Sequence, residues 1–103
     1  MAYIIKRTDS ANEDLLSIIN YIASDTQSIN TAIKCLDILE EGINKLLDFP
    51  EIGVKPRYKS VRSQDYRVLI IENKLVFYKI FRQKKEIIIY RILDGRQEYK
   101  NMI

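Results

Sequence analysis

The sequence predicts an α+β fold: an N-terminal strand, a two-helix hairpin and a three-stranded antiparallel meander, forming one small sheet with the helices packed on one face. In the N-terminal half, residues 11–22 and 32–47 place apolar side chains at the three-four spacing of helices. Residues 66–93 contain three runs dominated by Val, Ile, Phe and Tyr, which is typical of strands. The length of 103 residues, 47% of them hydrophobic, fits a single domain, residues 1–103, with one core.

The first strand is expected at residues 3–7, and a helix follows it directly. Ser10 and Glu13 match a capping box, in which the Ser10 hydroxyl accepts a hydrogen bond from the Glu13 amide and the Glu13 carboxylate reaches back. The apolar residues that follow lie on one helical stripe: Ala11, Leu15, Ile18, Ile19 and Ile22. Residues 25–28 interrupt this pattern, so the first helix ends there.

A second helix is expected to begin near Ser28 or Asn30. Its apolar stripe has the same rhythm: Ala32, Cys35, Leu36, Leu39, Ile43, Leu46 and Leu47. On this stripe Cys35 is expected to act as a small buried hydrophobic residue. Gly42 costs about 1 kcal/mol in a helix interior relative to Ala, which suggests close packing against a neighbour. Phe49 precedes a proline and so ends the helix.

Residues 50–65 are expected to form one long irregular segment, and three strands follow it at residues 66–71, 75–81 and 86–93. The gaps between these strands have the length of hairpin turns. The last strand contains three consecutive isoleucines, so it is apolar on both faces and is expected to lie in the middle of the sheet. The N-terminal strand is expected to pair with it.

The composition excludes several kinds of chemistry. The chain has no histidine, which excludes a Ser-His-Asp triad and a Cys-His nucleophile. It has one cysteine, which excludes an internal disulfide and makes a zinc site unfavourable. No metal, cofactor or small-molecule ligand is expected, and any catalysis would use Arg, Lys, Tyr, Asp or Glu. The sequence shows neither a membrane-length apolar run nor a signal-peptide pattern, which indicates a cytoplasmic protein without a membrane partner.

The charge is divided unevenly along the chain. Residues 1–53 carry four basic and nine acidic side chains, whereas residues 54–103 carry thirteen basic and five acidic ones. The C-terminal half therefore has a net charge of +8 and could meet a polyanion or an acidic protein. The alternative is that the two halves pair in space and neutralise each other.

Four segments carry a family resemblance: residues 11–22, residues 46–53, the strands at 66–68 and 76–80, and residues 90–99. In this order and spacing the chain resembles toxins of the RelE/ParE superfamily from bacterial type II toxin–antitoxin pairs. The resemblance implies a growth inhibitor that a cognate antitoxin holds silent. RelE-like members enter the ribosomal A site and cut mRNA without a metal, whereas ParE-like members poison DNA gyrase and cleave nothing.

Metal-free RNA cleavage needs cations at the scissile phosphate and a positioned acid or base. If the chain is a nuclease, the resemblance assigns it four candidate catalytic residues: Arg67, Arg96, Glu98 and Tyr99. Leu69 and Leu75, however, occupy strand positions where the nucleases carry cations. Loss of one such preorganised contact can cost roughly 10²–10³ in rate. This departure favours a ParE-like gyrase inhibitor, and a RelE-like, ribosome-dependent mRNA endoribonuclease is the alternative.

A second set of candidates would bind a target or nucleic acid: Lys55, Arg57, Lys59, Arg62 and Arg91. Cations mixed with Tyr58 are typical of a nucleic-acid or ribosome contact, although a solvated loop has much the same composition. Arg67 and Arg91 could instead pair with acids on neighbouring strands.

The expected partners are macromolecules. One is a cognate antitoxin that is acidic and partly disordered when free, since the cationic half of the toxin would attract an acidic segment. The other is the target, either DNA gyrase or the ribosome with its mRNA.

Overall fold

The β-branched and aromatic runs of the C-terminal half form three strands in the computed structural model, which describes residues 2–95: β2 (Arg67–Ile71), β3 (Lys74–Phe81) and β4 (Glu86–Asp94). They pair antiparallel in chain order, and β1 (Ile4–Arg7) pairs parallel with β4. The described residues therefore form one mixed sheet with the order β1-β4-β3-β2. This confirms the predicted α+β class and the central position of β4.

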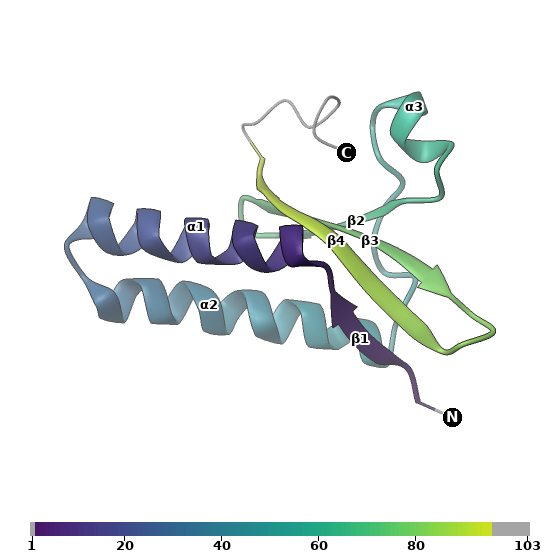
Figure 1. Ribbon diagram of the computed structural model, residues 1–103, viewed down its shortest axis with the longest axis horizontal. Helices are drawn as coiled ribbons and strands as arrows, with labels where there is room; N and C mark the ends of the chain where they lie inside the picture. The colour runs from purple at the N-terminus through teal and green to yellow at the C-terminus, as the bar shows by residue number, and fades with distance from the viewer. Residues whose placement is uncertain (1, 96–103) are drawn as a thin grey trace.

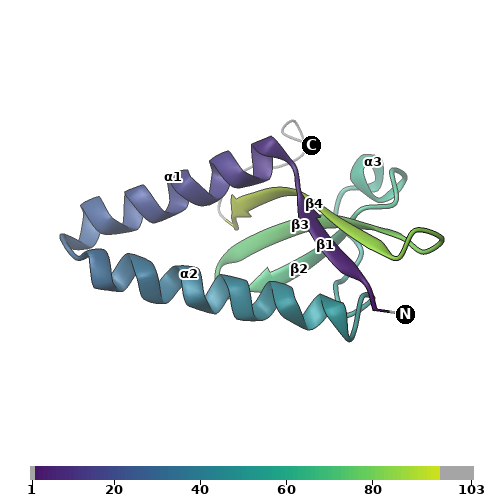
Figure 2. The ribbon, with the colours of Figure 1, turned by 60° about the horizontal axis from the view of Figure 1, so that its bottom comes forward.

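The two predicted helices form the long hairpin seen in Figures 1 and 2, α1 (Asp9–Thr26) and α2 (Ile29–Asn44), with a 3-10 turn at Lys45–Leu47. Ser28 is the N-cap of α2, since its hydroxyl accepts the Thr31 N–H at 3.1 Å. The predicted capping box on Ser10 is wrong. Thr8 caps α1 instead, and it also donates its own N–H to the Ile89 carbonyl. Because the helix begins at Asp9, Ser10 already lies within its first turn and cannot be its N-cap.

The main core lies between this hairpin and one face of the sheet. It contains side chains from both helices, the 3-10 turn and the three C-terminal strands: Ala11, Leu15, Leu39, Ile43, Leu46, Leu69, Val76, Tyr78, Ile87, Ile89 and Ile92. A Cβ added at Gly42 would lie 2.5 Å from the Ile71 Cδ1 atom, so α2 packs tightly against β2 at this point, as the sequence indicated. No helix within residues 2–95 is both long enough and apolar enough to cross a membrane.

The segment at residues 50–65 differs from the prediction because it is not wholly irregular. Val54 pairs with Val68 at the outer edge of β2, and α3 (Lys59–Arg62) adds one helical turn. A second apolar cluster forms here on the sheet face opposite the hairpin: Val61, Val68, Phe77 and Leu93. Figure 1 shows α3 on the far side of β2 and β3 from α2. The hairpin covers one face as expected, but this segment partly covers the other.

Candidate target-binding surface

A cationic pocket of about 400 Å³ lies where α3 meets the start of β2. Its lining contains four of the cations that the sequence singled out, namely Lys55, Lys59, Arg62 and Arg67. The other lining residues are Ser63, Asp65 and Tyr66. The local sequence explains the arrangement. Val61 is buried in the second apolar cluster, whereas Lys59 and Arg62 are three residues apart, which places them on one side of the turn, toward solvent. Asp65, at a φ of 66°, then turns the chain into β2.

The pocket is positive because three of its four cations lack an acidic partner within the described residues. Within residues 2–95, Lys55, Lys59 and Arg62 form no ion pair, although the Arg62 Nη1 atom lies 3.5 Å from the Arg57 carbonyl oxygen. Asp65 is the single acidic residue in the lining, and it is also without an ion pair in this part of the chain. Three cations without ion pairs, set against the one carboxylate of the lining, create a potential that attracts anions.

Arg67, a candidate catalytic residue, is largely occupied by the loop that precedes α3. Its Nη1 atom donates to the Gly53 carbonyl at 3.1 Å and to the Glu51 carbonyl at 3.4 Å, and its Nη2 atom lies 3.6 Å from the Glu51 carboxylate. Arg82 contacts the same carboxylate at 3.2 Å. Although Arg67 lines the pocket, its contacts hold this loop against the sheet.

Two of the predicted binding residues lie outside the pocket. The Arg57 guanidinium stacks 4.8 Å from the centre of the Tyr58 ring. Arg91 forms a bidentate pair with Asp14 of α1, with its Nε and Nη2 atoms 2.7 and 2.9 Å from the carboxylate oxygens. This hydrogen-bonded pairing raises the pKa of Arg91 above its ordinary value. In this pair, an acidic residue of the N-terminal half neutralises a basic residue of the C-terminal half.

The remaining candidates for catalysis, Arg96, Glu98 and Tyr99, lie outside the described residues. The resemblance places Leu69 and Leu75 where nuclease members carry cations, and in this structure both side chains pack against apolar clusters. Leu69 is buried in the main core, and Leu75 packs against the second apolar cluster on the opposite face. Neither position therefore presents a side chain that could contact a phosphate.

Sequence reasoning missed a cation on the outer sheet face. The Lys79 ammonium lies 4.5 Å from the centre of the Tyr66 ring and 5.2 Å from that of Tyr90, and the two rings meet edge to face. The pKa of Tyr66 is raised, mainly by burial and then by Tyr90. The β2–β3 register, with Arg67 opposite Tyr78, places Tyr66 beside Lys79. The alternation of side chains along the strands, combined with this register, would have predicted this cluster of Lys79, Tyr66 and Tyr90 (the Lys79 cluster).

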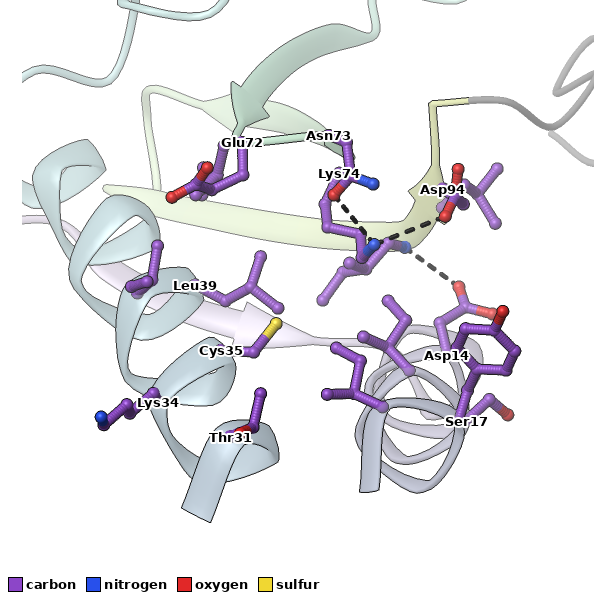
Figure 3. Close-up of a pocket in the computed structure, with 17 residues that line it drawn as sticks. Asp14, Ser17, Thr31, Lys34, Cys35, Leu39, Glu72, Asn73, Lys74 and Asp94 are labelled. Carbon is purple, nitrogen blue, oxygen red and sulfur yellow. Dashed lines mark hydrogen bonds and ion pairs between the residues drawn. The ribbon is translucent and has the colours of Figure 1, made fainter. Parts of the chain in front are cut away.

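A second hollow is an apolar groove of about 920 Å³ between the helical hairpin and the ends of β2, β3 and β4. Figure 3 shows the Cys35 thiol pointing into this groove. Cys35 is half-buried and packs against the main core, so the prediction of a small buried hydrophobic residue holds in part. Lys74 is 9% exposed there, and its ammonium contacts Asn73 Oδ1 at 3.0 Å and Asp94 Oδ2 at 3.4 Å. Among residues 2–95, no group of three or more His, Cys, Asp or Glu residues is arranged to hold a metal ion.

Comparisons with known proteins agree with this architecture. Residues 5–99 match the family model described as ParE toxin of type II toxin-antitoxin system, parDE. The chain is similar in structure to the chromosomal ParDE system from P. aeruginosa, with 21% identity, a TM-score of 0.73 and coverage of 89% of this chain and 95% of that one. It is also similar to the toxin–antitoxin complex RelBE2 from Mycobacterium tuberculosis, with 16% identity, a TM-score of 0.61 and coverage of 91% and 99%. No curated protein matches the sequence.

Proposed function

The chain belongs to the ParE toxin family of type II toxin–antitoxin systems, and we propose that it arrests bacterial growth by inhibiting DNA gyrase without cleaving nucleic acid. One observation carries the second half of this proposal. Leu69 and Leu75 stand where the resemblance places the cations of the nuclease members. Leu69 is buried in the main core, and Leu75 is half-buried against the second apolar cluster. Both positions therefore serve packing, which leaves a phosphate clamp without these two cations.

Purified toxin is expected to inhibit the supercoiling of relaxed plasmid DNA by gyrase, because a toxin that acts by binding needs only its target. In cells, induction without the antitoxin is expected to activate DNA-damage signalling while mRNA stays intact. Toxin mixed with excess antitoxin is the matched control and should leave supercoiling unchanged. Rapid mRNA cleavage in a translating extract, with normal supercoiling, would overturn the proposal.

The alternative is a RelE-like endoribonuclease, which the cationic pocket favours because RNA cleavage also begins with phosphate binding. In that case Arg67, Arg96 and Tyr99 would supply the phosphate contacts and Glu98 would transfer a proton. Arg96→Ala should then abolish mRNA cleavage while the variant still binds its antitoxin. Undiminished cleavage by this variant would exclude the assignment.

We also propose that a cognate antitoxin silences the toxin and that an apolar antitoxin segment lies in the groove of Figure 3. Both similar structures are toxin–antitoxin complexes. The groove offers exposed apolar surface, since Tyr21 is 62% and Ile38 is 42% exposed. An acidic stretch elsewhere in the antitoxin would be attracted by the net positive charge of residues 54–103.

Cys35 provides a direct test, because it is the one cysteine of the chain and lines the groove. Maleimide should modify Cys35 in the free toxin and react at least about tenfold more slowly in the antitoxin complex, since a bound segment covers the thiol. The control is Cys35→Ser combined with Gln83→Cys on the exposed β3–β4 turn, which should react equally in both states. Equal reactivity of Cys35 with and without antitoxin would place the antitoxin elsewhere.

A further inference from the structure

We infer that the cationic pocket beside α3 holds a backbone phosphate of a nucleic acid, and that the toxin binds nucleic acid with little preference for base sequence. The pocket volume of about 400 Å³ falls within the range of small-ligand sites, about 300–1,000 Å³. It is therefore large enough for a phosphate and its sugar. This inference does not rest on gyrase inhibition, since DNA binding and supercoiling are measured separately.

The donors in the pocket match the chemistry of a phosphate. Arg62 presents a planar fork, which suits phosphate oxygens, and Lys55 and Lys59 add two ammonium groups. None of the three is neutralised by a carboxylate within the described residues. The Ser63 hydroxyl is already engaged, because it donates to the Ser60 carbonyl at 3.1 Å. The binding energy would therefore come mainly from charge.

The Lys79 cluster favours a polyanion over a single carboxylate. Tyr66 forms part of the pocket lining, and Lys79 lies over the same ring at 4.5 Å. The positive charge thus continues from the pocket across Tyr66 onto the outer face of β3. A nucleic-acid strand carries a negative charge at every nucleotide and can contact both places, whereas an isolated acidic side chain can contact only one.

The same aromatic cluster argues against recognition of bases. Tyr66 meets Tyr90 and Phe77 edge to face, with ring centres 5.4 and 6.4 Å apart, and Lys79 lies over its face. The ring is therefore packed by its neighbours and is a poor platform for stacking a base. Contacts to phosphate position a strand but carry no sequence information. Binding is expected to depend strongly on salt and weakly on sequence.

The test is a fluorescence anisotropy titration of the toxin between about 50 and 200 mM NaCl. The probes are labelled 20-nucleotide single-stranded DNA, duplex DNA and single-stranded RNA, each in two unrelated sequences. The Lys59→Ala/Arg62→Ala variant should bind at least about tenfold more weakly, with a log–log salt slope smaller by about 2. The three probes show whether DNA or RNA supplies the phosphate.

The matched control is Lys34→Ala/Lys84→Ala, which removes the same charge from exposed positions on α2 and the β3–β4 turn and should keep near-normal affinity. Thermal melts of both variants check that they fold. Equal losses of affinity in the two variants would mean that only the net charge matters, which would overturn the inference. Absence of binding at about 50 mM NaCl would also overturn it. The inference would also be overturned if a poly-glutamate peptide bound more tightly than the nucleic-acid probes, or if the toxin strongly preferred one base sequence.

Discussion

Replacing Tyr78 by phenylalanine is expected to lower the free energy of unfolding by about 2–4 kcal/mol, measured by chemical denaturation. Tyr78 is fully buried, and burial raises the pKa of its phenol. The hydroxyl donates to the Pro50 carbonyl at 2.7 Å and accepts the Gly53 N–H at 3.0 Å. Phenylalanine keeps the ring but leaves both backbone groups without a partner, and each such group costs about 1–3 kcal/mol.

This hydroxyl also explains the glycine at position 53. A Cβ there would lie 2.5 Å from the Tyr78 oxygen, so any other residue would displace the loop. The matched control for the substitution is Tyr21→Phe, because Tyr21 is 62% exposed and its change should stay within about 0.5 kcal/mol. If Tyr78→Phe were as stable as Tyr21→Phe, the hydroxyl would not be holding the loop.

The fold could be predicted because its main signals are local and periodic. The apolar stripes of α1 and α2 fix their buried faces, and the isoleucines of β4 indicate a strand covered on both sides. The α3 turn could not be predicted, because Lys59–Arg62 is stable only when Val61 reaches the cluster under it. The cap on α1 was misassigned for a similar reason: Thr8 is selected by its pairing with β4, a contact distant in sequence.

The candidate surface was predicted in part. The cations around α3 were identified by composition, and the fold does bring Lys55, Lys59 and Arg62 to one pocket. The pairing of Arg91 with Asp14 joins residues 77 positions apart, and no local pattern reveals such a contact. Arg67 was assigned to chemistry by resemblance, whereas its position beside Glu51 and Gly53 gives it a role in the loop.

Asp14 should be the second residue on which stability depends strongly. Strand β1 ends at Arg7, opposite Ile89, so the remaining edge of β4 needs another partner. Asp14 supplies it: one carboxylate oxygen accepts the Ile92 N–H at 3.0 Å, while the same carboxylate binds Arg91. A side chain of α1 therefore continues the hydrogen bonding of the sheet and neutralises a cation in the same place.

Asp14→Ala is expected to destabilise the protein by about 2–4 kcal/mol, because it leaves a backbone N–H and the Arg91 guanidinium without this partner. The side chain of Asp14 is 14% exposed and that of Arg91 is 25% exposed. Water can therefore solvate the remaining charge, and the loss of stability should be smaller than the roughly 3–5 kcal/mol typical of breaking a fully buried ion pair. A double-mutant cycle with Arg91→Ala should give a coupling energy of about 1–3 kcal/mol. Asp14→Asn keeps an acceptor for Ile92 and should lose less. If Asn and Ala were equally damaging, the charge on Asp14 rather than its acceptor geometry would hold α1 against β4.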